Sequence, residues 1–412
     1  MGGAAGHLQH LHEDRDLTFT DLKEILSLAS TGQLEEVTEK FDGLNLVFSF
    51  DNSSGILKAA RAAGDIKRGG MSAEDLAAKF AGRGNLTKAF NDAFKILEGA
   101  VSALSDKDRL DIFGEQANRW YSMEIIFAEN PNVINYDSNS IVFHSTPVLQ
   151  IEESGSITTL ESGSAPGVKI LSANIQKMQK AVENSNWKIS GPSITRMSEL
   201  SNDTILNKTI QKIDKAIARA GVTDGNNIGD YLRALLEEDV QDLKLSTKAS
   251  EALIARCMQD DYAPTLIDIK KMIDKSSYDA VRQFVNNCPV LMKSYVRPLE
   301  LAINDFSIEA LKGLASTLID NPRKEILRLR SEVKTAIDSL QSSGDENVIQ
   351  ILQLQMEKLK SVSNITSSVE GVVFIYKGNA YKFSGSFAAV NQILGLFKYG
   401  RGKIKPITKP NT

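Results

Sequence analysis

Hydrophobic and polar residues alternate along several short stretches of the chain, and the clearest stretch is residues 44–50. Its larger apolar side chains recur at every second position, namely at Leu44, Leu46, Phe48 and Phe50. A period of two is typical of a β-strand with one face in a core. Similar patterns predict strands at 56–60, at 119–127 and from residue 139 onward. Near the end, residues 368–385 form two apolar runs split by Gly378-Asn379, which predicts a hairpin.

A helical spacing of three and four residues dominates two other regions. Residues 72–104 show it with a break at 82–84. Residues 168–363 show it almost throughout, which predicts about seven to nine helices with no fixed repeat. The Ser/Gly-rich segment 152–166 is predicted to be a linker before this helical region.

Strand patterns at both ends of the chain and helical patterns between them predict an α+β protein in three parts. Residues 1–160 and 364–412 form the two parts of one domain of antiparallel sheets with helices, and 161–363 form an all-α insertion. An insertion at a surface loop leaves the two parts of its host free to rejoin in space. We therefore expect the two ends of the chain to share a site.

Composition narrows the classes of protein that this chain can belong to. Its 412 residues are 42% hydrophobic and 24% charged, which is ordinary for a soluble protein of two or three domains. No apolar run approaches the length of a membrane span, so we expect no membrane association. Cys257 and Cys288 are too few for a disulfide framework, which favours a reducing cytoplasm. The net charge of -4 argues against a generally basic surface for nucleic acid.

Lys40 is the first candidate for chemistry, because it stands at the mouth of the strand at 44–50 beside Glu39, Asp42 and Gly43. A lysine amine becomes a nucleophile when desolvation or neighbouring positive charge lowers its pKa. The alternative is a solvated lysine before a turn. A second candidate is Glu124, a carboxylate in the middle of the predicted strand 119–127, which must face solvent or serve a site.

The stretch Glu39-Lys40-Phe41-Asp42-Gly43-Leu44-Asn45 resembles motif I of the covalent nucleotidyltransferases, which include ATP-dependent DNA and RNA ligases and mRNA capping enzymes. The motif is Lys-x-Asp-Gly, and its lysine becomes linked to AMP or GMP. The Glu before the Lys and the Asn five positions after it resemble the second RNA-ligase type of T4-like phages. The resemblance covers about half the chain, at residues 20–150 and 365–400.

This resemblance implies that Lys40 is the nucleophile and that several other residues bind the nucleotide around it. Glu39 and Phe143 would hold adenine, with Phe143 stacking on the base, although a core position is the other interpretation of Phe143. The sugar and phosphates would be oriented by Asn45, Arg61 and Glu124; for Arg61 the alternative is a surface arginine at a strand end. Glu370 would bind a divalent metal and Lys382 the α-phosphate, as in motifs IV and V.

The chain departs from the family pattern in three places. Met123 stands where motif III often has glycine, and Ala380 and Ser384 stand where motif V often has a second lysine. The predicted helical insertion separates motifs III and IV, which are close together in familiar ligases. The basic tail from Lys398 is too short for the oligonucleotide-binding barrel of many DNA ligases, which favours the RNA-ligase type.

The resemblance implies an ATP-dependent RNA ligase that uses Mg²⁺ or Mn²⁺ and joins 5′-phosphate to 3′-hydroxyl ends of nucleic acid, RNA rather than DNA. It implies residence in the cytoplasm, that of the host if a phage encodes the chain. Two alternatives remain open. One is a non-catalytic binding or assembly protein with a ligase-like shell. The other is a nucleotidyltransferase that modifies something other than nucleic acid.

The start of the chain carries three of the four histidines, His7, His10 and His12. Clustered histidines are common metal ligands, which makes a zinc site one interpretation. The other interpretation is a flexible or capping segment, because the cysteines lie far away in the sequence.

Overall fold

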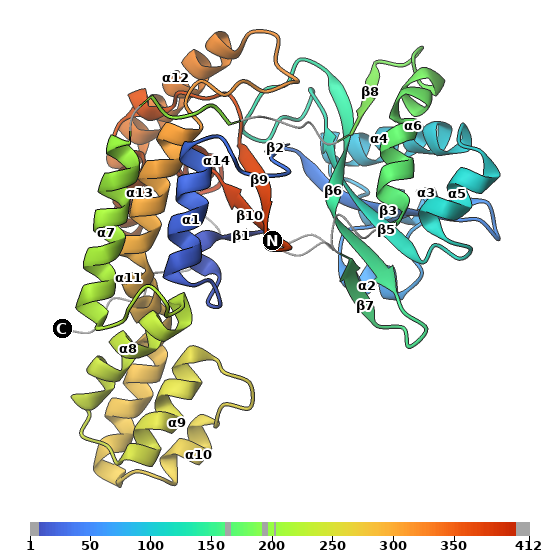
Figure 1. The fold of residues 1–412 in the computed structure, drawn as a ribbon. Helices are drawn as coiled ribbons and strands as arrows, with labels where there is room; N and C mark the ends of the chain where they lie inside the picture. The colour runs from blue at the N-terminus through green and yellow to red at the C-terminus, as the bar shows by residue number, and fades with distance from the viewer. Residues whose placement is uncertain (1–7, 161–165, 192–196, 202, 401–412) are drawn as a thin grey trace.

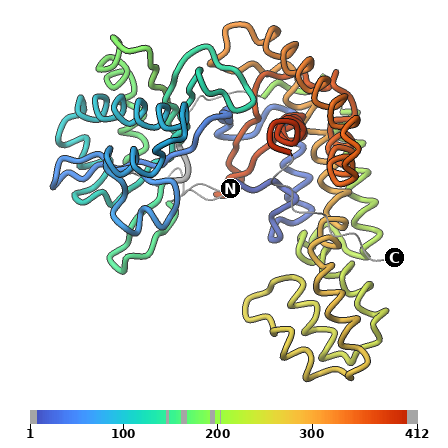
Figure 2. Tube along the Cα trace, turned by 180° about the vertical axis from the view of Figure 1, so that it is seen from behind, coloured from blue at the N-terminus to red at the C-terminus, as the bar shows by residue number. Residues whose placement is uncertain are grey.

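The computed structural model describes residues 8–160, 166–191, 197–201 and 203–400. It is a mixed α+β structure with two separate β-sheets, one in each half of the molecule (Figure 1). One half contains a six-stranded sheet and the helices packed on it. The other half contains a four-stranded sheet and a long helical part that extends away from it (Figure 2). The α+β class expected from the sequence therefore agrees with the structure.

The six-stranded sheet has the strand order β4-β3-β5-β6-β7, with β8 paired to β6. Its strands are β3 (Leu44–Asp51), β4 (Ile56–Ala60), β5 (Arg119–Ile126), β6 (Asn139–Ile151), β7 (Ile157–Leu160) and β8 (Trp187–Ser190). Short α2 (Ala63–Lys67) follows β4. The face that carries Leu46, Phe48 and Phe50 is buried under α3 (Ala73–Lys79), α4 (Asn85–Ser102), α5 (Asp106–Phe113) and α6 (Pro166–Ala181). The predicted alternation along β3 is therefore confirmed.

The four-stranded sheet has the order β1-β10-β9-β2 and joins both ends of the chain. Its strands are β1 (Gln9–His10), β2 (Thr38–Lys40), β9 (Gly371–Tyr376) and β10 (Asn379–Phe383). The β9–β10 hairpin turns at Lys377-Gly378, where both residues have positive φ, 48° and 83°. The prediction of a turn at Gly378-Asn379 was wrong by one residue, because Asn379 already pairs with Tyr376. Two positive φ angles match the twist of a two-residue hairpin.

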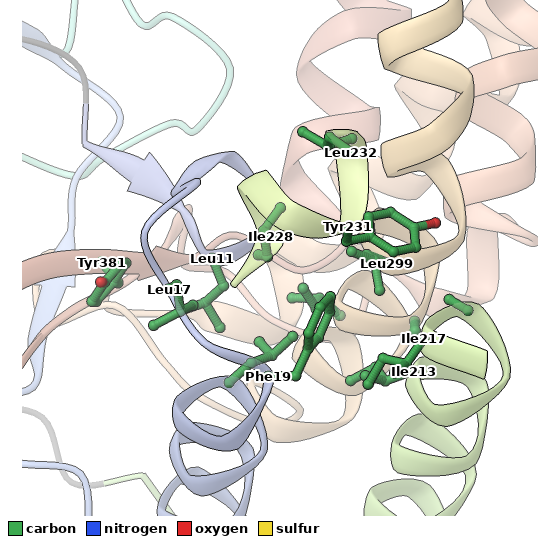
Figure 3. Close-up of a cluster of buried hydrophobic side chains, with 14 of the residues drawn as sticks. Leu11, Leu17, Phe19, Ile213, Ile217, Ile228, Tyr231, Leu232, Leu299 and Tyr381 are labelled. Carbon is green, nitrogen blue, oxygen red and sulfur yellow. The ribbon is translucent and has the colours of Figure 1, made fainter. Parts of the chain in front are cut away.

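Helices make up most of the second half. They are α1 (Phe19–Ser30), α7 (Thr204–Ala220), α8 (Ile228–Gln241), α9 (Thr247–Met258), α10 (Leu266–Lys270) and the 33-residue α11 (Tyr278–Ala310), with 3₁₀ turns η1 (Leu11–Glu13) and η2 (Lys275–Ser277). Their shared core meets one face of the four-stranded sheet, and Figure 3 shows Phe19 and Leu299 within it. The helices α8, α9 and α10 lie at the end of α11 farthest from the sheet (Figure 1).

A third hydrophobic cluster joins the two halves. It contains Phe41, Ile126 and Val133 from the first half, and side chains from α12 (Pro322–Gln341), α13 (Glu346–Leu359) and α14 (Phe387–Tyr399) in the second. The 3₁₀ turn η3 (Val362–Asn364) links α13 to the last hairpin. Because this cluster is buried, it fixes how the two sheets face each other.

The region between the sheets departs from the sequence-based prediction in two ways. Residues 157–160 of the predicted linker are strand β7, paired with the end of β6, and 161–165 lie outside the described residues. The first elements after them, α6 and β8, pack on the six-stranded sheet rather than with the later helices. Among the described residues, no helix has both the length and the apolar character needed to cross a bilayer.

Candidate active site

Lys40 is the last residue of β2, and its amine forms an ion pair with the Glu370 carboxylate, 330 positions away in the sequence. The contact arises because Lys40 pairs with Gly371, the first residue of β9. A side chain at 371 is excluded, since a Cβ there would lie 2.1 Å from the Phe383 carbonyl oxygen. Glu370 itself precedes the strand, so strand alternation does not prevent its carboxylate from reaching the Lys40 face.

Asp42 anchors the link between Lys40 and the other sheet. Its carboxylate accepts hydrogen bonds from Asn132 Nδ2 (2.6 Å) and from the backbone N–H groups of Val133 (2.7 Å) and Ile134 (2.9 Å). Gly43 follows in a space without room for a side chain, since a Cβ would lie 2.6 Å from the Ile125 carbonyl oxygen. The Lys-x-Asp-Gly sequence thus carries the chain from one sheet to the other through one tightly fixed turn.

Three polar side chains of the six-stranded sheet lie on the face opposite its helices. Asn45 of β3 pairs with Glu124 of β5, so both side chains share this face. His144 of β6 lies beside them, with Nε2 3.6 Å from the Glu124 carboxylate. The charge of Glu124 acts on both Lys40 and Arg61, which places these groups in one electrostatic neighbourhood.

Arg61 stands just after β4, and its guanidinium donates a hydrogen bond to the Asn45 carbonyl oxygen. The same guanidinium lies 5.5 Å from the centre of the Phe90 ring, a cation–π contact. Burial lowers the pKa of Arg61 from its ordinary value, against the opposing charges of Glu124 and Asp65. Arg61 is therefore a held, partly desolvated cation and not a freely moving surface side chain.

Phe143 is not at this site. Its side chain is 1% exposed and packs among the residues under α4 and α6, with its ring 5.1 Å from that of Phe48. The expectation that Phe143 faces a nucleotide is therefore wrong for this structure. The next residue, His144, lies on the other face beside Glu124 and was missed. Strand alternation was the available signal, but Val142 and Phe143 are both buried, so the apolar pattern did not reveal the faces.

Glu39 lies one residue before Lys40, so its side chain points to the opposite face of the four-stranded sheet. Its Oε2 accepts hydrogen bonds from the backbone N–H (3.0 Å) and the hydroxyl (2.9 Å) of Thr317. Its Oε1 is buried with no hydrogen-bond partner among the described residues. Burial raises the pKa of Glu39, although the bonds from Ser316 and Thr317 oppose this.

Lys382 shares the sheet face of Lys40. It pairs with Val373, which in turn pairs with Thr38, two residues before Lys40. Its side chain is buried, and burial lowers its pKa from the ordinary value; the charge of Lys40 acts in the same direction. The predicted motif IV and V residues therefore both lie at Lys40, while Glu39 and Phe143 lie on other faces.

Burial and charge act in opposite directions on the central pair. Burial alone would lower the pKa of Lys40, but the carboxylates of Glu370, Glu124 and Asp42 raise it above its ordinary value. Burial raises the pKa of Glu370 to about 7, against the opposing charge of Lys40. At neutral pH the Lys40 amine is thus protonated, and the pH is close to the pKa of the Glu370 carboxylate beside it.

The site suits a divalent ion that arrives with a nucleotide. Among the described residues, no group of three or more His, Cys, Asp or Glu side chains could hold a metal alone. Mg²⁺ commonly binds through one or two carboxylates, several waters and the phosphates of its nucleotide. Glu124, whose charge acts on Lys40, supplies such a carboxylate, whereas the Glu370 carboxylate is paired with the Lys40 amine. When bound, the ion would screen the charge of the phosphates.

Comparison of the chain with protein-family models, with curated protein sequences and with solved structures gives no match. The residues of the site and their geometry therefore carry the functional argument.

Proposed function

We propose that the protein is an ATP-dependent polynucleotide ligase of the covalent nucleotidyltransferase class, acting on RNA through a lysyl-AMP intermediate. The observation that carries the proposal is the contact between Lys40 and Glu370 across the junction of β2 and β9. The resemblance assigns these two residues to separate motifs, and their contact across 330 positions of sequence supports that assignment. The shared neighbourhood of Lys382, Glu124 and Arg61 adds to this support.

The chemistry follows from the groups around Lys40. Its amine attacks the α-phosphate of ATP, a nitrogen–phosphorus bond forms, and the bond to the leaving pyrophosphate breaks. The amine must first lose a proton, and Glu370 is in contact with it and has a pKa of about 7, as a general base requires. Lys382 neutralises charge that develops on the α-phosphate. AMP then passes to a 5′-phosphate end, and a 3′-hydroxyl displaces it.

The remaining groups would bind the nucleoside. The Asn45 amide oxygen is buried without a hydrogen-bond partner among the described residues, which suits a ribose hydroxyl. His144, on the same face of the six-stranded sheet as Glu124, would take the base-facing role that the resemblance gives to Phe143.

Self-labelling tests the proposal directly. The purified protein is incubated with α-³²P-ATP and Mg²⁺ or Mn²⁺, and we expect an acid-sensitive label on the protein. The Lys40→Ala variant should lose the label, whereas Lys271→Ala, which changes a lysine that is 71% exposed, should keep it. A label that persists in Lys40→Ala would remove the proposed nucleophile. Sealing of a nicked RNA by the labelled protein then tests the substrate.

One observation favours a second function, a binding protein with a ligase-like site and no turnover. The raised pKa of Lys40 keeps its amine protonated, and a protonated amine is not a nucleophile. Such a protein would bind ATP in an equilibrium assay yet take no label at any pH. A transferase with another target would take the label and fail to seal RNA.

A further inference from the structure

His10 and His12 lie next to the candidate active site. Strand β1 adds to the four-stranded sheet parallel to β10, and His10 pairs with Lys382. Paired residues of adjacent strands point to the same face of a sheet, so the His10 side chain flanks Lys382. His7 lies outside the described residues.

His12 extends this group. Its ring stacks on that of His10, with centroids 5.2 Å apart and planes 17° from parallel. The Glu13 carboxylate accepts a hydrogen bond of 2.7 Å from the His10 backbone N–H, which holds the segment in place. The His12 Nδ1 is buried and has no hydrogen-bond partner among the described residues. A buried polar atom without a partner is costly, and its presence points to a ligand that supplies one.

His12 lies among charges of both signs: the carboxylates of Glu300 and Glu13 act on it more strongly than the cations Lys358 and Lys382. Lys382 acts electrostatically on His12 as well as on Lys40, so it links the histidines to the proposed nucleophile. Burial lowers the pKa of both His12 and Lys382, the latter with help from Lys40. The His12 imidazole is thus neutral at pH 7 in the free protein, and a bound phosphate chain would favour its charged form.

We propose that His10 and His12 bind the outer phosphates of a nucleoside triphosphate whose α-phosphate lies at Lys40 and Lys382. This inference rests on the proposed function and extends it to the leaving group. It also offers a replacement for the second lysine of motif V, because Ala380 and Ser384 stand at the positions where the family often has that lysine. The histidines would hold the pyrophosphate as the bond to the α-phosphate breaks.

Calorimetric titration with three probes tests the proposal: inorganic tripolyphosphate, ATP and AMP. The variants are His10→Gln, His12→Gln and the double alanine variant, and Gln9→Ala is the matched control on the exposed neighbour. Loss of one hydrogen bond to a charged phosphate weakens binding by roughly tenfold or more. We expect that loss for tripolyphosphate and ATP, unchanged binding of AMP, and wild-type behaviour from Gln9→Ala. Melting temperatures of the glutamine variants show whether the fold is retained.

The outcomes separate the two proposals. Wild-type protein that labels at Lys40 while the folded glutamine variants bind tripolyphosphate normally would overturn the histidine site and leave the ligase proposal standing. Histidine-dependent binding of tripolyphosphate without any labelling would support the phosphate site and reject the ligase. Equal weakening of AMP and ATP would also overturn the inference, because it would mean a general loss of structure.

Discussion

At the scale of single residues, the ion pair between Lys40 and Glu370 sets the conditions for any reaction. The Lys40 amine is protonated, although it must be neutral to act as a nucleophile. The Glu370 carboxylate has a pKa of about 7, so it can accept the proton of the amine near neutral pH. Under the proposed function, this amine stays protonated until a bound nucleotide and its metal ion change the local charge. Formation of the reactive, neutral amine would then depend on nucleotide binding.

The first prediction is a pH dependence of self-labelling. Glu370 must be ionised to take the proton, so the rate should rise through its pKa of about 7 and level off above pH 8. Glu370→Gln keeps the size of the side chain but cannot accept the proton, and it should lower the rate by roughly 10²-fold or more. The rise near pH 7 should also disappear. Initial rates of labelling between pH 5.5 and 9 measure both effects; an unchanged profile in the variant would reject Glu370 as the base.

A second prediction separates the two neighbours on β6. His144→Ala should raise the KM for ATP several-fold and leave stability almost unchanged, because the side chain is partly exposed and lies beside Glu124. Phe143→Leu should instead cost about 1 kcal/mol of unfolding free energy and leave the KM unchanged, because the ring lies in the core. Urea denaturation and labelling kinetics on both variants give the comparison. A raised KM in Phe143→Leu alone would restore the sequence-based interpretation.

At the scale of elements, the site depends on the closeness of β2, β9 and β10. Lys40 reaches Glu370 only because Gly371 lets the backbone of β9 approach the Phe383 carbonyl. The β9–β10 hairpin positions Lys382, and β1 places His10 beside it. The chemistry therefore rests on main-chain spacing as much as on the side chains themselves.

The third prediction follows from that spacing. Gly371→Ala should destabilise the protein by about 1 to 3 kcal/mol, as overpacked sites do, and should abolish labelling by shifting Glu370. Gly395→Ala is the matched control, since a Cβ at this helical glycine meets nothing within 4 Å. Alanine there should stabilise the protein by about 0.5 to 1 kcal/mol and leave labelling intact. Chemical denaturation with labelling tests both; a fully active Gly371→Ala would contradict the spacing argument.

Much of this arrangement could be predicted from local sequence, and the reasons for the failures are physical. Alternation predicts β3 and its faces, and the motif resemblance points to Lys40, Glu370 and Lys382, which the structure brings together. Phe143 was misplaced because β6 is buried on both faces, which removes the polar positions that reveal direction. The hairpin turn was misplaced because a lysine rarely adopts the positive φ seen at Lys377.

Long-range contacts were beyond any local pattern. The parallel pairing of β1 with β10 joins residues near opposite ends of the chain, and two residues in β1 carry too little pattern to predict it. The Glu39 bonds to Thr317 likewise depend on the loop after α11. Such features follow from the whole fold and not from neighbouring residues.

At the scale of the whole molecule, the two sheets are held together by polar bonds as well as by the third hydrophobic cluster. Glu325 of α12 is buried and accepts a hydrogen bond of 2.9 Å from the Asn135 backbone N–H. Arg328 pairs with Glu325 and donates a bond of 2.6 Å to the Val133 carbonyl oxygen. Val133 also donates its backbone N–H to Asp42, which lies next to Lys40. The loop around Val133 therefore contacts both α12 and the Lys40 site.

The last prediction tests that coupling with probes that the sequence supplies. Both tryptophans, Trp120 on β5 and Trp187 on β8, lie in the half with the six-stranded sheet, so their fluorescence reports on that half. Most of the helical signal in circular dichroism comes from the other half. We expect the two signals to give one coincident unfolding transition in the wild-type protein, because the halves share a buried cluster.

Glu325→Ala should separate these transitions. It leaves the Asn135 N–H without its partner and removes one of the two carboxylates that pair with Arg328, the other being Glu332, which costs about 1 to 3 kcal/mol at the contact between the halves. Glu309→Ala removes a carboxylate that is 43% exposed and pairs with Lys312, so it should leave both transitions unchanged. Separate transitions already in the wild-type protein would mean that the halves fold independently. The Lys40 site would then form only when a nucleotide binds to both sheets, and saturating ATP with Mg²⁺ should merge the transitions.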